Sequence, residues 1–343
     1  MKIMNIMLSR DLGGVQQSFL DYSKMLKMEQ IDVVEVTSIG AAINNMTNVN
    51  YTLLNLGNWD IFSSMRLKSI IRKERPDVVI AHGGRAIKFT LQARNSGFLP
   101  IVGIIHSDKL KWVDKCDYMI ALTNAMQKAA IESGIDHSRV ALIPNTIDLS
   151  QCKIIKKKEE DPLPPVIGTM GRFVPKKGFD VFLESLAILK KEGVQFKAII
   201  GGGGEEEQNL KALSHELGLT HYVEFIGWVK DKEKFFNEID IFCLPSRAEP
   251  FGIILLEAMA YKTPVISTKS NGPLEIITDE IDGLLVDIGS ADQMAESIKL
   301  LLDDEISSSK LASNALLTAR KNYDTSVVSK KLSNFLNHII RKS

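Results

Sequence analysis

Short apolar runs alternate with segments of helical periodicity along almost the whole chain, and this alternation limits the possible folds more than any other feature. In the first half the apolar runs IMNIML, DVVIAH and DYMIAL precede the helical segments GVQQSFLDYSKMLK, AIKFTLQARNSG and NAMQKAAIESG. Such an order indicates a parallel sheet with helices on both faces. A charge run with three prolines, SQCKIIKKKEEDPLPP at residues 150–165, interrupts the pattern, and a second alternation follows. The sequence therefore predicts an α/β fold with two Rossmann-like, doubly wound parallel-sheet domains.

The interruption also sets the predicted domain boundaries. We expect an N-terminal domain over residues 1–155, a C-terminal domain over residues 156–325, and a final helix over residues 326–343 that packs back on the N-terminal domain. Two such domains joined by a linker imply a cleft between them. Ligands of open α/β sheets bind outside the carboxyl ends of the strands, so we expect the chemistry in the strand-to-helix turns.

Composition excludes several classes of protein. A hydrophobic fraction of 45% with 24% charged residues is typical of a globular chain, and 42 basic against 42 acidic residues leave no overall basic field for nucleic acid. Three well-separated cysteines without metal-ligand or disulfide spacing predict a reduced, cytoplasmic protein. No run of about 18 apolar residues occurs, so the sequence predicts no membrane span.

The segment SRAEPFGIILLEAMAYKTPVIS, residues 246–267, carries two carboxylates around a predicted helix start. Glu249 follows an apolar strand, and Glu257 lies inside the helix that Gly252 opens, among apolar neighbours. A buried carboxylate is costly unless it is paired, and the vicinal hydroxyls of a ribose supply two donors. The free backbone amides of the helix start favour a phosphate. The alternative is an ordinary exposed helix residue and a loop charge.

Together with other segments, this one resembles a known family. Glu249 and Glu257, with seven residues between them, look like the EX7E motif of family 4 retaining glycosyltransferases, which adopt the two-domain GT-B fold. Agreeing signatures are GGVQ at residues 13–16, IPNTID at 143–148, GRFVPKKGFD at 171–180 and GLLVD at 283–287. The resemblance covers nearly the whole chain.

The resemblance implies an activity. A nucleoside diphosphate sugar, expected to be a UDP-sugar, would donate its sugar to a hydroxyl of a glycan or glycolipid acceptor, which the N-terminal domain would bind. The GGxQ form is similar to that of lipopolysaccharide core transferases, which implies lipopolysaccharide or surface polysaccharide biosynthesis. The family resemblance also implies that Glu249 and the amides near Phe251, Gly252 and Ile253 position the donor sugar, while Glu257 holds the ribose.

Two basic residues follow the first predicted strand of the second half. Arg172 and Lys177 lie in the turn after VIGTMG. Negative charge grows on a leaving diphosphate as the glycosidic bond breaks, so fixed cations aimed at it stabilise the transition state more than the ground state. The resemblance likewise matches both residues to the family's diphosphate-binding pair, whereas a solvated basic turn is the alternative.

The glycine run at residues 202–204 invites interpretation as a phosphate-binding loop. Three glutamates follow it directly and would repel a phosphate, so we prefer a tight turn with close backbone packing. The resemblance still implies that Gly202 lies near the nucleoside, and that Trp228 and Val229 line the base pocket. An apolar strand end explains the latter two residues almost as well.

In the first half, Gly13 and Gly14 follow the first apolar run and precede a helix, where backbone amides can approach an anionic or sugar group closely. A simple turn is the alternative. His106 and His82 each end an apolar run and face the predicted cleft. The resemblance implies that His106 contacts the donor sugar near the reacting carbon. His82 is a candidate acceptor contact, with a structural role as its alternative.

The sequence predicts transfer without a metal or other cofactor. No isolated Asp-x-Asp follows a strand end, as a site for a hard cation needs, and Arg172, Lys177 and a helix start can supply the same positive charge. The resemblance implies retention by attack on the face of the leaving group. Closure of the two domains would limit donor hydrolysis.

Two further points concern partners and rival functions. The segment IFSSMRLKSIIRKER, residues 61–75, mixes basic and apolar residues, and predicts peripheral contact with an anionic membrane on the cytoplasmic face of the inner membrane. A solvated surface helix is the alternative. Two other functions stay open: a nucleotide-sugar 2-epimerase, which joins the same two halves, and a non-catalytic module that binds nucleotide sugars.

Overall fold

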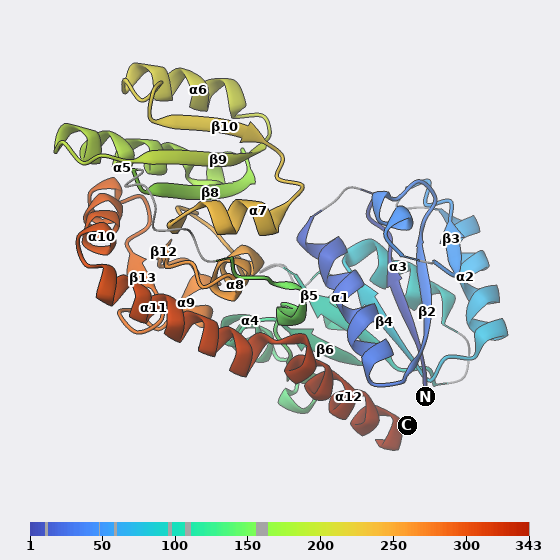
Figure 1. Cartoon of the computed structure of the whole chain (residues 1–343). Coiled ribbons are helices and arrows are strands. Elements are labelled where there is room, and N and C mark those ends of the chain that lie inside the picture. The colour runs from blue at the N-terminus through green and yellow to red at the C-terminus, as the bar shows by residue number, and fades with distance from the viewer. Residues whose placement is uncertain are drawn as a thin grey trace. The chain divides into compact units, whose positions relative to one another are not determined.

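The computed structural model describes residues 1–10, 13–47, 49–57, 60–94, 98–106, 111–155 and 164–342. The chain forms two compact units, one of Met1–Thr146 with Asp324–Ser343 and the other of Ile147–Tyr323. Each unit contains a parallel sheet with helices packed on it (Figure 1). The doubly wound α/β fold class predicted from the alternation is therefore confirmed.

The first unit contains a sheet of order β3-β2-β1-β4-β5-β6-β7. Its strands are β1 (Lys2–Met7), β2 (Asp32–Ser38), β3 (Tyr51–Leu53), β4 (Val78–His82), β5 (Ile101–Ile105), β6 (Tyr118–Ala121) and β7 (Val140–Leu142). Its α-helices in the described ranges are α1 (Gly14–Met28), α2 (Ile61–Glu74), α3 (Gly84–Ala93), α4 (Asn124–Glu132) and α12 (Thr325–Lys342). Every residue of β4 and β5 is buried, as expected of apolar strands covered on both faces.

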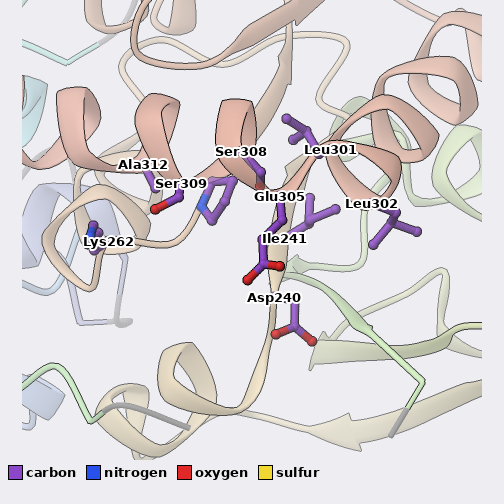
Figure 2. A pocket seen from close by; sticks show the side chains of 10 residues that line it. Asp240, Ile241, Lys262, Leu301, Leu302, Glu305, Ser308, Ser309 and Ala312 are labelled. Carbon is purple, nitrogen blue, oxygen red and sulfur yellow. The ribbon is translucent and has the colours of Figure 1, made fainter. Parts of the chain in front are cut away.

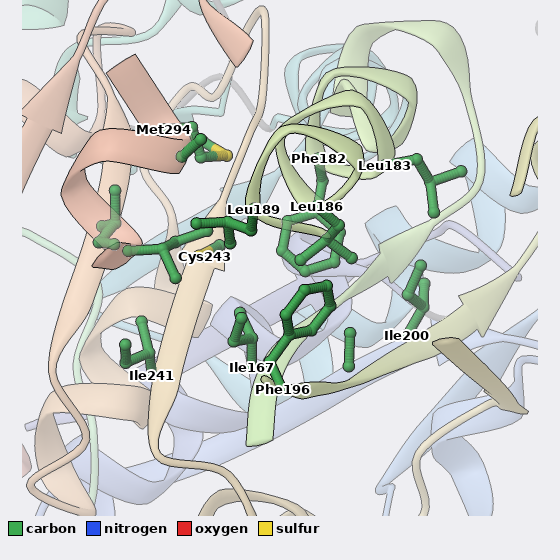
Figure 3. Packing of buried hydrophobic residues seen from close by; sticks show 14 of the residues in the cluster. Ile167, Phe182, Leu183, Leu186, Leu189, Phe196, Ile200, Ile241, Cys243 and Met294 are labelled. Carbon is green, nitrogen blue, oxygen red and sulfur yellow. The ribbon is translucent and has the colours of Figure 1, made fainter. Parts of the chain in front are cut away.

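The second unit contains a sheet of order β10-β9-β8-β11-β12-β13. Its strands are β8 (Val166–Arg172), β9 (Lys197–Gly203), β10 (Val223–Gly227), β11 (Ile241–Leu244), β12 (Val265–Thr268) and β13 (Leu284–Val286). Its described α-helices are α5 (Phe179–Lys191), α6 (Glu207–Glu216), α7 (Lys232–Glu238), α8 (Ile253–Ala260), α9 (Pro273–Ile276), α10 (Ala291–Asp303) and α11 (Glu305–Thr318). Figure 3 shows the core of this unit, where Phe182 and Leu186 of α5 pack over Ile167 of β8.

The structure assigns residues 147–155 to the second unit, whereas the sequence pattern placed them in the first. Hydrogen bonds explain this assignment. The amide of Ile147 donates to the carbonyl of Tyr323 over 2.9 Å, and the amide of Ile155 donates to Oδ1 of Asn237 over 2.8 Å. Of the predicted linker, residues 156–163 lie outside the described residues.

Helix α12 belongs to the first unit and packs against α1. The hydroxyl of Ser329 on α12 donates to the carboxylate of Glu29, which follows α1, over 2.7 Å. Tyr118 of β6 meets Phe335 of α12 edge to face, with 6.1 Å between ring centroids. The first unit is therefore built from both ends of the chain, and the second lies between them in sequence.

Both sheets reverse their strand order beside their first strand, between β1 and β4 in one unit and between β8 and β11 in the other. At such a switch point the two neighbouring loops leave in opposite directions, which opens a crevice at the carboxyl ends of the strands. No helix in the described ranges is both long and apolar enough to cross a membrane.

Candidate functional site

The turn after β8 is locked to the loop after β11, across the switch point of the second sheet. Gly178 ends the turn with φ 66°, and a Cβ at this position would collide with the carbonyl oxygen of Pro245. The amide of Arg247 donates to the carbonyl of Lys176 over 2.8 Å, and its guanidinium pairs with Asp180 over 2.6 Å. These contacts fix the two loops that carry the predicted catalytic residues.

An ion pair joins two of the predicted site residues across this switch point. The ammonium of Lys177 contacts Oε2 of Glu249. The side chains are only 19% and 11% exposed, so water screens the pair weakly. Sequence analysis assigned these residues separate roles, and the structure brings them together. The neighbouring Lys176 is exposed, and Arg172 is exposed at the end of β8.

The three predicted residues Phe251, Gly252 and Ile253 lie between Glu249 and the first turn of α8. Gly252 caps the helix with φ 96°, and a Cβ there would lie 3.4 Å from Cγ of Glu249. Phe251 is buried edge to face against Tyr323, and Ile253 begins the helix. The backbone carbonyl of Glu249 also accepts from the amide of Gly272 over 2.8 Å.

Glu257 is buried on α8 and has a basic partner. Its Oε1 accepts from Nζ of Lys232, the first residue of α7, over 2.6 Å. This pairing offsets the cost of burying the carboxylate. Sequence reasoning missed Lys232, because it lies 25 positions away and only the fold brings it to Glu257. Burial, with a smaller contribution from neighbouring charges that include Glu257, raises the pKa of the adjacent Tyr261.

Two glycines of the run at residues 202–204, Gly202 and Gly203, belong to strand β9, whereas the sequence suggested a turn for the whole run; Gly204 follows the strand. Gly202 has φ 138°, and a Cβ there would strike the carbonyl of Gly171. A Cβ at Gly203 would lie 2.9 Å from Nε1 of Trp228. The run therefore allows close backbone packing, as preferred above.

Trp228 and Val229 lie directly on this glycine backbone. Val229 Cγ2 would be 2.5 Å from a Cβ at Gly201, and the indole of Trp228 is exposed. Arg172 is in register with Gly203, on which the indole rests. The loop from Trp228 to Lys232 thus connects the glycine run with Glu257 at one edge of the sheet.

In the first unit the two predicted histidines are brought together. His82 ends β4 and His106 follows β5, and their rings stack with centroids 5.6 Å apart. Burial holds the pKa of His82 well below its usual value of 6.5 and lowers the pKa of His106 to about 4. Both imidazoles are therefore neutral at physiological pH.

The predicted glycine pair is not required by the backbone. Gly13 precedes α1 with φ 172°, an extended conformation that any residue adopts. A Cβ at Gly14 would meet no atom of the described residues within 4 Å. The structure thus gives no tight turn as the reason for this pair.

Among the cavities that the described residues form, three lie at different places in the fold. One of about 490 Å³ in the first unit is lined by Leu8, Ser9, Arg10, Val15, His82, Gly83, Gly84, Arg85 and Ala86. One of about 510 Å³ lies between the turn after β8 and α6, against Phe179 and Leu210. The third, of about 390 Å³, lies at the start of β11, where Asp240 and Glu305 point into it (Figure 2). That position is the amino edge of the sheet, opposite the predicted site.

Across the described residues, no three His, Cys, Asp or Glu side chains gather closely enough to hold a metal ion. At the carboxyl edge of the second sheet, two acids are instead paired with bases, Glu249 with Lys177 and Glu257 with Lys232. This arrangement offers cations for an anionic leaving group and carboxylate oxygens for sugar hydroxyls.

Comparisons with known proteins agree with this architecture. Residues 12–151 match the family described as Glycosyltransferase Family 4, and residues 150–317 match Glycosyl transferases group 1. The lipopolysaccharide core biosynthesis glycosyltransferase LpsE of Rhizobium meliloti is 31% identical over 254 residues, which are 74% of this chain and 73% of LpsE.

Two solved structures are similar in fold. Anabaena HepE in complex with UDP and glucose superposes with a TM-score of 0.84 at 21% identity, covering 98% of this chain and 99% of that one. A glycosyltransferase from Rickettsia africae superposes with a TM-score of 0.87 at 19% identity, covering 100% and 99%.

Proposed function

The chain belongs to the group 1 and family 4 glycosyltransferases, and from this membership we propose that it transfers a sugar, with retention, from a UDP-sugar to a glycan or glycolipid acceptor. The donor binds at the carboxyl edge of the second unit's sheet. The acceptor belongs to lipopolysaccharide or another surface polysaccharide, and the protein acts in the cytoplasm. The name of LpsE supports the acceptor class, and the UDP in the HepE complex supports the donor class.

The observation that carries this proposal is the ion pair between Lys177 and Glu249 at the switch point. An ammonium has three donors, of which Glu249 takes one, so two remain for phosphate oxygens. The second oxygen of Glu249 remains for a hydroxyl of the donor sugar. The ion pair thus reaches both the diphosphate and the donor sugar, and the bond between these two groups is the one that breaks.

The pair of Glu257 and Lys232 extends the same site toward the nucleoside. Oε1 of Glu257 accepts from Lys232, and the carboxylate keeps its other oxygen for the ribose hydroxyls. Trp228 and Val229, on the glycine backbone of β9, offer an apolar surface beside it for the base.

The chemistry requires stabilisation of the departing diphosphate. Lys177 supplies a charge fixed by its partner, Arg172 supplies a second at the end of β8, and the amides of Gly252 and Ile253 supply the positive end of α8. This charge supports metal-independent transfer. Near the donor sugar, neutral His106 accepts or donates a hydrogen bond without adding a charge.

The test uses the whole chain with UDP-sugars, with and without core oligosaccharide acceptors, and measures free UDP and the anomeric configuration of the product. We expect UDP release that depends on acceptor, survives a chelator and preserves the donor's configuration. An inverted anomer would contradict retention. Formation of an epimerised nucleotide sugar without acceptor would show that the chain is an epimerase and would refute the proposed transfer.

We also propose that the first unit contacts an anionic bilayer. At the start of α2, Ile61, Phe62 and Met65 are 69%, 74% and 65% exposed, and exposed Arg66 and Arg72 follow on the same helix. Apolar side chains beside cations suit the headgroup region of such a membrane.

Vesicle co-sedimentation tests this contact. Phe62→Ser should weaken binding to vesicles with anionic lipid by about tenfold, because one large side chain leaves the interface. Ile306→Ser, at an exposed apolar residue of the second unit, is the matched control and should change nothing. Equal binding of the wild type to neutral and anionic vesicles would exclude an electrostatic contribution to membrane binding.

A further inference from the structure

The cavity of about 490 Å³ in the first unit lies at the switch point of its sheet. It is lined by residues after β1, among them Arg10, and by residues at the end of β4 and the start of α3, among them His82 and Arg85. It therefore occupies in the first unit the position that the ion pair of Lys177 and Glu249 occupies in the second.

The cavity is electropositive. Both guanidiniums bind neutral groups: Arg10 donates to the carbonyls of Leu54 and Asn55 over 2.9 and 3.3 Å, and Arg85 donates to Oδ1 of Asn55 over 3.1 Å. In the described part of the chain neither is paired with a carboxylate, and no described lining residue is acidic. Among the residues that the structure describes, the charges of these two arginines thus have no carboxylate partner beside the cavity.

The start of α3 adds to this field. Gly83 precedes the helix with φ 82°, and no side chain caps its first amides. The free amides at the beginning of a helix of ten residues favour an anion.

His82 gives the cavity a second, different chemistry. The amide nitrogen of Asn5 donates to the carbonyl of Phe19 over 3.0 Å and to Ser23 over 2.9 Å, so its Oδ1 faces Nε2 of His82 over 2.8 Å. Because Oδ1 only accepts, Nε2 of His82 carries the proton. Since burial keeps this ring neutral, its Nδ1 holds a lone pair.

His82 is 2% exposed, and its Nδ1 has no hydrogen-bond partner among the described residues. A buried acceptor left without a donor is unfavourable, so a hydroxyl brought by a ligand would gain from this atom.

We propose that this cavity binds an acceptor sugar that carries an anionic group, phosphate or carboxylate, held by Arg10 and Arg85, while one of its hydroxyls donates to Nδ1 of His82. The identification of this ligand as the acceptor rests on the proposed function, whereas its chemistry rests on the cavity alone. Arg10 binds the carbonyls of Leu54 and Asn55, and the side chains of Leu54 and of Leu56, which follows Asn55, are exposed, which suits an acceptor attached to a lipid.

The experiment measures dissociation constants of four probes on the whole chain by ligand-observed NMR: glucose 6-phosphate, glucuronate, glucose and inorganic phosphate. Arg10→Gln and Arg85→Gln remove the charges. Arg66→Gln, at an exposed arginine of α2 outside the cavity, is the matched control.

We expect at least one anionic sugar to bind about tenfold more tightly than glucose, and each cavity variant to lose about tenfold, since one charge-assisted hydrogen bond is removed. The tighter of the phosphate and carboxylate probes identifies the charged group. Equal affinity for glucose and both anionic sugars, or an equal loss in Arg66→Gln, would overturn the proposal. If inorganic phosphate binds as tightly as glucose 6-phosphate, the sugar contributes nothing to binding, and the proposed hydrogen bond to His82 is refuted.

These measurements need neither donor nor turnover. Sugar binding that persists in a chain without transferase activity would refute the proposed function alone. Acceptor-dependent UDP release by a chain that binds neither anionic sugar would refute this inference alone.

Discussion

Replacing Lys177 by methionine tests the central role of the ion pair. Two unit charges about 4 Å apart interact by about 4 kcal/mol at an effective dielectric constant of about 20. Glu249 neutralises part of the ammonium's charge, so we assign about 3 kcal/mol to its interaction with the leaving diphosphate. Lys177→Met should therefore lower kcat about a hundredfold.

The assay is acceptor-dependent UDP release at saturating donor, with far-UV circular dichroism to verify the fold. Lys176→Met is the matched control, because this adjacent lysine has the same charge but is exposed. We expect it to retain nearly full activity. If both variants lose activity equally, the turn acts by its net charge, and the argument from the geometry of the pair is refuted.

Three other predictions concern stability. Lys232→Met should destabilise the chain by about 1–2 kcal/mol in urea unfolding, because it leaves buried Glu257 unpaired, and unchanged unfolding would show that the pair is immaterial. Gly202→Ala should cost about 2–3 kcal/mol through strain and collision, whereas Gly14→Ala, in open space, should be nearly neutral; equal effects would contradict the packing. Because the pKa of His106 is about 4 when folded and 6.5 when unfolded, stability should fall as pH decreases from 6.5 to 4, and His106→Asn should flatten that slope in pH-dependent unfolding.

Local sequence patterns predicted the fold because strands buried on both faces are continuous apolar runs, and β4 and β5 illustrate this directly. The same patterns singled out Glu249 and Glu257 as candidates, since both belong to one short segment around a helix start. Interpretation of the glycine run at residues 202–204 was less accurate. Consecutive glycines are typical of a turn, and the sequence alone does not show that the indole of Trp228 packs on the backbone of Gly203.

Partners distant in sequence were beyond this reasoning. The pairing of Lys177 with Glu249 and of Lys232 with Glu257 depends on loops that only the sheet order brings together. Residues 147–155 were likewise assigned by composition, whereas hydrogen bonds from the amides of Ile147 and Ile155 join them to the second unit.

The interleaving of the two units along the chain has a consequence for biosynthesis. The ribosome delivers every residue of the second unit before the helix α12 that completes the first. The second unit can thus finish folding while α1 still lacks its covering helix. A nascent chain stalled within residues 324–343 would accordingly expose apolar surface on the first unit, and a protease pulse during synthesis should cleave there.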